Sequence, residues 1–165
     1  MQQMSRSGNG LNKGTLIALI SSLIVLLDYF TKKTIESKVL LYESINVLPF
    51  LNIVHVENKG AAFSLLTNLG NNYFVAISII AISVIIFYLS QLPKGLELFS
   101  LSMILGGAIG NLIDRLRIGK VVDFIDIYIG GWHWPAFNVA DSALTVGIIL
   151  FLLANIRRGK RSREM

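Results

Sequence analysis

Cysteine is absent from this chain of 165 residues, and charged residues are scarce, at 15%. The lack of cysteine excludes a disulfide scaffold, a thiolate zinc site and a cysteine nucleophile. The chain also lacks a His-Glu-x-x-His motif, a Gly-x-Ser-x-Gly elbow and a phosphate-binding loop. The sequence therefore gives no support for a zinc metalloprotease, a serine hydrolase or a nucleotide-binding protein. Hydrophobic residues make up 53% and the mean hydropathy is +0.63. A soluble domain of this length could not bury so much apolar surface.

Four stretches of the chain contain no charged residue, and they predict membrane-spanning helices. A helix needs about 20 apolar residues to cross a bilayer. One stretch exceeds that length, and the other three fall slightly short, each with an aspartate at its edge. We therefore expect a single integral membrane domain of the all-α class, with transmembrane helices at about residues 14–31, 73–92, 98–114 and 137–156.

The basic residues predict how these helices are oriented, because Lys and Arg concentrate on the cytoplasmic side. Arg6 and Lys13 precede the first span, Lys94 lies between the second and third, and five basic residues follow the fourth. An even number of spans puts both termini on one side, which we expect to be cytoplasmic. The first span lacks a small-x-small cleavage pattern, which favours an uncleaved anchor. The basic tail indicates a membrane-flanking segment and not a nucleic-acid-binding face.

Three aspartates lie inside or at the edge of the predicted spans. Asp28 and Asp114 come near the outer ends of the first and third spans, and Asp141 lies in the first turns of the fourth. This topology places all three at the depth of the outer leaflet. A carboxylate is costly to bury unless it is paired or neutralised, so the cluster indicates a functional site.

Polar residues accompany these aspartates at helical spacing. Asn111 and Asp114 share one face of the third span, and Asn138 and Asp141 share one face of the fourth. Such faces either hold neighbouring helices together or line a site, and the sequence leaves both interpretations open. Arg115 either reaches lipid headgroups or donates hydrogen bonds to a carbonyl or phosphate.

The two connections on the outer side have patterns of their own. Partial alternation of apolar and polar residues around Pro49 predicts short strands, a small β-like cradle. Residues 120–134 are mostly apolar and include two Trp and one Tyr, which suits an interfacial segment. Asp123 and Asp126 in this segment would point to opposite faces of a strand but share one face of a helix.

Carboxylates are thus the remaining candidates for chemistry. Two carboxylates at close range share a proton, so one can activate a water while the other acts as an acid, which suffices to hydrolyse an amide. The pattern favours Asp141 and leaves Asp114, Asp123 and Asp126 open as its partner. Two other functions are a proton-relaying transporter and a non-enzymatic assembly factor. Transport sites, however, tend to lie near the midplane of the bilayer.

Four motifs, in this order between the four spans, resemble those of bacterial lipoprotein signal peptidase, the type II signal peptidase. They are Asn-Lys-Gly-Ala-Ala-Phe-Ser at residues 58–64, Gly-Gly-Ala-Ile-Gly-Asn-Leu-Ile-Asp-Arg at 106–115, Val-Val-Asp-Phe-Ile-Asp at 121–126 and Phe-Asn-Val-Ala-Asp-Ser at 137–142. The resemblance covers nearly the whole chain, from about residue 14 to 156. It implies an aspartic endopeptidase of the bacterial inner membrane that removes the signal peptide from prolipoproteins.

The resemblance also implies a substrate and roles for individual residues. The cut would fall before a cysteine that carries diacylglycerol, and no cofactor or metal would be needed. Asp123 and Asp141 match the catalytic pair of the family, and a monomer is expected. The resemblance places six further residues in or around the site: Asn58, Asn111, Arg115, Asn138, Asp28 and Asp114. One departure is Tyr29, where the family usually has glutamine, and it puts the local contacts of the first helix in doubt.

Overall fold

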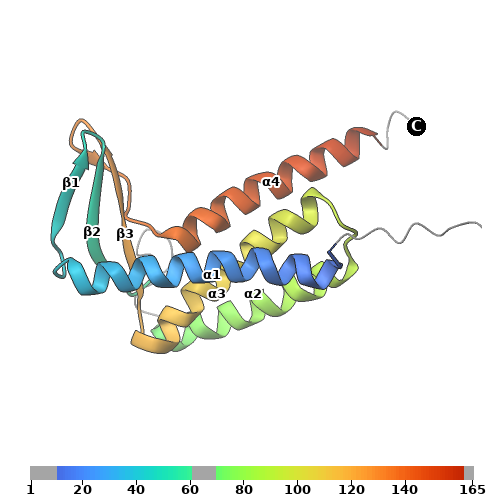
Figure 1. The fold of residues 1–165 in the computed structure, drawn as a ribbon, viewed down its shortest axis with the longest axis horizontal. Coiled ribbons are helices and arrows are strands. Elements are labelled where there is room, and N and C mark those ends of the chain that lie inside the picture. Colours follow the sequence, from blue (N-terminus) through green and yellow to red (C-terminus); the bar gives the residue numbers. More distant parts are fainter. Residues whose placement is uncertain (1–10, 61–69, 162–165) are drawn as a thin grey trace, which may run out of the picture.

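The computed structural model describes residues 11–60 and 70–161 and contains four long helices with a sheet at one end (Figure 1). The helices are α1 (Lys13–Lys38), α2 (Asn71–Gln91), α3 (Leu96–Ile118) and α4 (Val139–Arg161). The strands are β1 (Ser44–Leu48), β2 (Leu51–Asn58), β3 (Val121–Ile129) and β4 (Trp132–His133). Arg6, residues 61–64 of the first motif and the last four residues of the basic tail lie outside the described residues.

Each of the four helices is long and apolar enough to cross a membrane. Their outward faces expose many large apolar side chains, including Leu23, Phe87 and Leu152, as helices surrounded by lipid do. The prediction of a four-helix membrane protein with a small β cradle is confirmed. α1 and α3 continue beyond residues 31 and 114, where the predicted spans end, because the charged residues there pair inside the protein, as shown below.

The third helix, α3, packs against all three other helices and is the most buried of the four. Glycines allow this close packing. A Cβ on Gly107 would lie 2.5 Å from the carbonyl oxygen of Ala140 in α4, and a Cβ on Gly110 would lie 2.7 Å from the carboxylate of Asp28 in α1. The small-residue face of α3 therefore brings the aspartate-bearing parts of α1 and α4 together.

The strands form an antiparallel sheet in the order β1-β2-β3-β4. The predicted strands around Pro49 are β1 and β2, and the interfacial segment of residues 120–134 forms β3 and β4. β3 is a strand, so Asp123 and Asp126 point to opposite faces of the sheet. The strand pairs Asp123 with Val56 and Asp126 with Asn52.

The segment before α4 is bound to the sheet. Phe137 exchanges backbone hydrogen bonds with Ile125 of β3, at 2.8 and 3.0 Å. This contact places Asn138 between β3 and the first turn of α4. Asp28 of α1 fixes that turn from the other side, since its carboxylate accepts a hydrogen bond from the Ala140 amide at 2.9 Å. The sheet and the first turn of α4 thus meet at the end of the bundle away from the N-terminus of α1 (Figure 1).

Candidate active site

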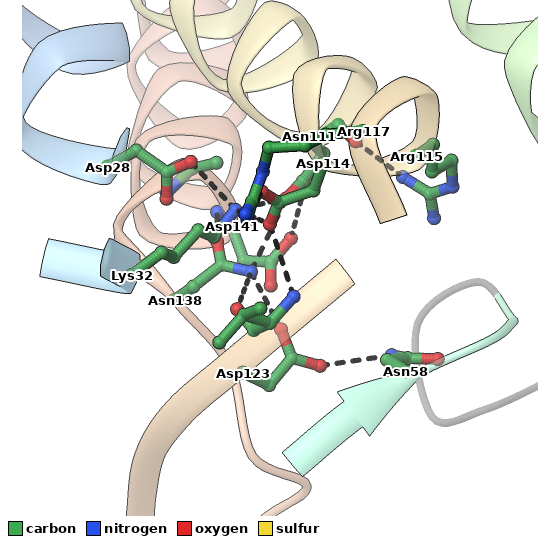
Figure 2. A network of polar contacts seen from close by, with 12 residues as sticks. Asp28, Lys32, Asn58, Asn111, Asp114, Arg115, Arg117, Asp123, Asn138 and Asp141 are labelled. Carbon is green, nitrogen blue, oxygen red and sulfur yellow. Dashed lines mark hydrogen bonds and ion pairs between the residues drawn. The ribbon is translucent and has the colours of Figure 1, made fainter. Parts of the chain in front are cut away.

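Asp123 and Asp141 come from different elements and are joined by the side chain of Asn138. The Asn138 amide nitrogen donates to the carboxylate of Asp123 at 2.7 Å, and its amide oxygen accepts from the backbone N–H of Asp141 at 2.8 Å. Asn138 is fully buried and also donates to the Val122 carbonyl at 3.3 Å. One asparagine therefore fixes the position of both aspartates (Figure 2).

Another asparagine donates a hydrogen bond to each of the two carboxylates. Asn58, the last residue of β2, donates to Asp123 at 3.1 Å. Asn111 of α3 donates to Asp141 at 2.8 Å. These amides hold the two side chains in fixed orientations, which is what acid–base chemistry at a bound substrate requires.

The environment of Asp123 favours its protonated form. Burial raises the pKa of Asp123 from the usual 3.8 to about 7, and the nearby charge of Asp141 acts in the same direction. The amides of Asn58 and Asn138 lower this pKa by less. At neutral pH, Asp123 can therefore hold a proton that it can donate.

A buried lysine that the sequence analysis overlooked lies directly behind this pair. Lys32 is 1% exposed and contacts the carboxylates of Asp28 at 2.7 Å and Asp114 at 3.0 Å. It also donates to the side-chain oxygen of Asn111 at 3.1 Å, which turns the amide nitrogen of Asn111 toward Asp141. The spacing of Asp28 and Lys32, four residues apart on a helix, was the sequence signal for this pairing.

Asp114 supports the site and does not pair with Asp141. Its carboxylate contacts Lys32, receives a hydrogen bond from the Val122 backbone at 3.2 Å, and pairs with Arg117 at 3.1 Å. Arg117, a second residue absent from the sequence analysis, also binds Glu36 of α1 at 3.0 Å. Asp114 thus ties α1 and α3 to the start of β3.

Asp126 is also separate from the pair. On the other face of β3, it accepts a hydrogen bond from Asn52 at 2.8 Å and contacts His133 at 2.9 Å. Of the three partners that the sequence left open for Asp141, Asp123 is the one that lines the same cavity and is joined to Asp141 by a single side chain, that of Asn138.

Arg115 lies beside the pair and binds backbone carbonyls. It donates to Gly60 at 3.1 Å and to Asn111 at 3.4 Å, and its guanidinium lies 5.4 Å from the centre of the Phe74 ring. Of the two interpretations of Arg115, this geometry favours the carbonyl donor. Arg115 thereby holds the chain that follows β2 and Asn58.

A cavity of about 760 Å³ opens over the aspartates. Asp123, Asp141, Asn58, Asn111 and Arg115 supply its polar wall. Most of the remaining lining is apolar or aromatic and comes from β3, residues 132–137 and α4, including Ile127, Trp132, Trp134, Leu144 and Val146. Asn138, Asp114 and Asp28 lie behind this wall. Among residues 11–60 and 70–161, no three His, Asp or Glu side chains gather as metal ligands.

Comparisons with known proteins agree with one another. Residues 20–157 match the family model described as signal peptidase (SPase) II. A lipoprotein signal peptidase of Janthinobacterium sp. (strain Marseille) is 49% identical, over 84% of this chain and 87% of that protein. The lipoprotein signal peptidase of Alteromonas mediterranea is 43% identical, over 88% and 82%. A bacterial membrane enzyme solved by the in meso method at 2.3 Å resolution has a TM-score of 0.83 at 36% identity, covering 92% of this chain and 93% of that one.

Proposed function

The chain belongs to the signal peptidase II family, whose members remove signal peptides from prolipoproteins, and we propose that Asp123 and Asp141 are its catalytic pair. The observation that carries this proposal is the Asn138 side chain, which binds both aspartates at the floor of one cavity. The protein is an aspartic endopeptidase with several membrane spans.

The two aspartates divide the chemistry between them. Asp141 takes a proton from a water, the resulting hydroxide adds to the carbonyl carbon of the scissile bond, and Asp123 gives its proton to the carbonyl oxygen. In the second step Asp141 protonates the leaving nitrogen, Asp123 takes back the proton from the hydroxyl, and the C–N bond breaks. Each carboxyl group ends in its starting state, as general acid–base catalysis requires.

The raised pKa of Asp123 predicts a fall in activity on the alkaline side of neutrality. Because kcat/KM reports ionisations of the free enzyme, it should decline above about pH 7, where Asp123 loses the proton that it donates. Initial rates from about pH 5 to about pH 9 test this, with Asp126→Asn as the control that keeps the same profile. A rate that keeps increasing above pH 8 would contradict the assignment of Asp123 as the acid.

We further propose that the substrate already carries a diacylglyceryl group on the cysteine that directly follows the scissile bond. The cavity supports this because its wall changes from polar at the aspartates to apolar along α4. The acyl chains can stay in the bilayer while the peptide reaches Asp141. Asn58, Asn111 and Arg115 offer hydrogen-bond donors beside the aspartates for the peptide and the glyceryl ester.

This proposal includes a placement in the bacterial inner membrane, with both termini in the cytoplasm and the cavity toward the outer leaflet. Two features support it. Lys13 is the first residue of α1 and Lys94 lies between α2 and α3, and these helix ends are the ones away from the sheet (Figure 1). Basic residues at that end favour the cytoplasmic side. Trp132 and Trp134 lie at the sheet end, as interfacial aromatics do. We also propose a monomer, because the site network closes within one chain.

The lipid should mainly position the scissile bond, because acyl chains in a membrane or micelle are already out of water. Displacement of a reacting bond by about 1 Å costs about 10²-fold in rate, so a prolipoprotein without the diacylglyceryl group should be cut about 10²-fold more slowly. The test is cleavage of matched modified and unmodified prolipoproteins by the purified chain in the same detergent. Asp141→Asn serves as the inactive control. Equal rates for the two substrates would show that the lipid is not recognised.

A further inference from the structure

A second polar cluster lies on the face of the sheet that points away from the aspartate pair. At its centre is Asp126, which is 7% exposed. Its carboxylate accepts from the Asn52 amide at 2.8 Å, and both of its oxygens lie 2.9 Å from Nδ1 of His133. Nδ1 of His133 is the hydrogen-bond donor in this contact when the Asp126 carboxyl group is ionised, because an ionised carboxylate only accepts.

The cluster closes into a ring that includes every strand. The imidazole of His133 stacks on the Tyr128 ring, with 5.1 Å between centres and 17° between planes. Asn46 of β1 donates to the Tyr128 hydroxyl at 2.8 Å and to the Asn52 side chain at 3.1 Å. The Asn52 amide donates in turn to Asp126 of β3, which completes the ring. We call these five residues the latch.

The latch contacts β4, which is the shortest strand of the sheet. β4 is only two residues long and follows a turn at Gly130 and Gly131, both at positive φ. A short hairpin is at best marginally stable by itself. Within the described residues, the backbone bonds of β4 go to β3 alone, so the side-chain contacts of His133 add a tie to the rest of the sheet.

The residues on both sides of His133 belong to the catalytic cavity. Trp132 and Trp134, the two neighbours of His133, both line the cavity, whereas His133 does not. The two indole rings pack edge to face, 5.8 Å apart. Because Trp132 and Trp134 are the chain neighbours of His133, contacts that hold His133 in place also restrict the two tryptophans in the cavity wall.

We propose that Asp126 and His133 are positioning residues for the substrate, acting through the Trp132–Trp134 wall. This inference rests on the proposed function. If the latch opens, the tryptophan wall loosens and substrate binding weakens. Asp123 stays in place, because Asn58 and Asn138 hold it independently of the latch. The latch should thus affect KM and leave kcat nearly unchanged.

The chain contains only two tryptophans, and both are in this wall, so their fluorescence anisotropy reports on it without a label. His133→Leu removes the hydrogen bond to Asp126 and should lower the anisotropy. His133→Asn places an amide nitrogen where Nδ1 was, and should restore it. His133 is largely exposed, so neither change threatens folding. Ile45→Ala weakens β1 outside the latch and is the control that should leave the anisotropy unchanged.

Kinetics on a diacylglyceryl prolipoprotein supply the second measurement. His133→Leu should raise KM about three- to tenfold, the range expected for losing one hydrogen bond, while kcat stays within about twofold. His133→Asn should return KM toward the wild-type value. Unchanged anisotropy and KM in His133→Leu would overturn the proposal, as would a fall in kcat at constant KM. Anisotropy needs no turnover, so failure of the wild-type chain to cut the substrate would count against the proposed function alone.

Discussion

Replacing either member of the pair, as Asp123→Asn or as Asp141→Asn, should lower kcat by at least about 10²–10⁴-fold, the usual scale of lost acid–base catalysis. Asparagine keeps the size of the side chain but can neither hold nor transfer the proton. The effect should be on turnover, because the cavity and the surrounding amides remain. Single-turnover cleavage of a diacylglyceryl prolipoprotein in detergent measures this loss separately from substrate binding.

Asp126→Asn is the matched control, three residues away on the same strand. Its side chain points to the other face of β3, so kcat should change by less than about tenfold. Equal losses of kcat in all three variants would mean that the partner of Asp141 is wrongly assigned. Retention of turnover in Asp123→Asn and Asp141→Asn would favour a scaffolding role for the polar faces of α3 and α4.

Asp123 also links stability to pH in a direction that can be checked. Its raised pKa means that the folded chain binds this proton more tightly than the unfolded chain. The contribution of Asp123 to stability is therefore present at low pH and is lost as the pH rises from 3.8 to about 7. The proposed catalytic acid is thus a carboxyl group whose ionisation weakens the fold.

The helices could be predicted from the sequence because lipid imposes a simple condition: about 20 residues without unpaired charge. The same condition set the ends of the predicted spans, and α1 and α3 continue beyond those ends. The predicted first span stops at residue 31 because Lys32 follows, whereas α1 continues to Lys38. A lysine that pairs with Asp28 and Asp114 inside the bundle costs far less than one facing lipid. One of its two partners, Asp28, lies four residues away on the same helix, but the other, Asp114, lies 82 residues away, which no local pattern reveals.

The choice of a partner for Asp141 required the fold as well. Helical spacing placed Asn138 and Asp141 on one face, and this follows from the geometry of a single helix. The distinction between Asp123 and Asp126 depends on β3 being a strand and on which of its faces meets α4. Contacts between distant segments, such as Phe137 with Ile125, decide that. Family resemblance had pointed to Asp123 on its motif alone.

The largest loss of stability should come from Lys32→Met, which removes the buried positive charge between Asp28 and Asp114. Methionine fills a similar volume, but it leaves two carboxylates in the interior without that cation. Breaking a buried ion pair by removing one partner typically costs about 3–5 kcal/mol of unfolding free energy. The variant should also lose activity, since the amide of Asn111 would no longer be held toward Asp141.

Lys33→Met is the control for this experiment, because Lys33 is the next residue and its pair with Glu36 is much more exposed. An exposed pair contributes only about 0–1 kcal/mol, so the control should unfold nearly as the wild type does. Unfolding free energies can be measured by denaturant titration in mixed micelles. Adding Asp28→Asn to Lys32→Met removes one of the unpaired carboxylates and should recover part of the loss. If Lys32→Met unfolds at the same denaturant concentration as Lys33→Met, the buried lysine is not what holds α1, α3 and the first turn of α4 together.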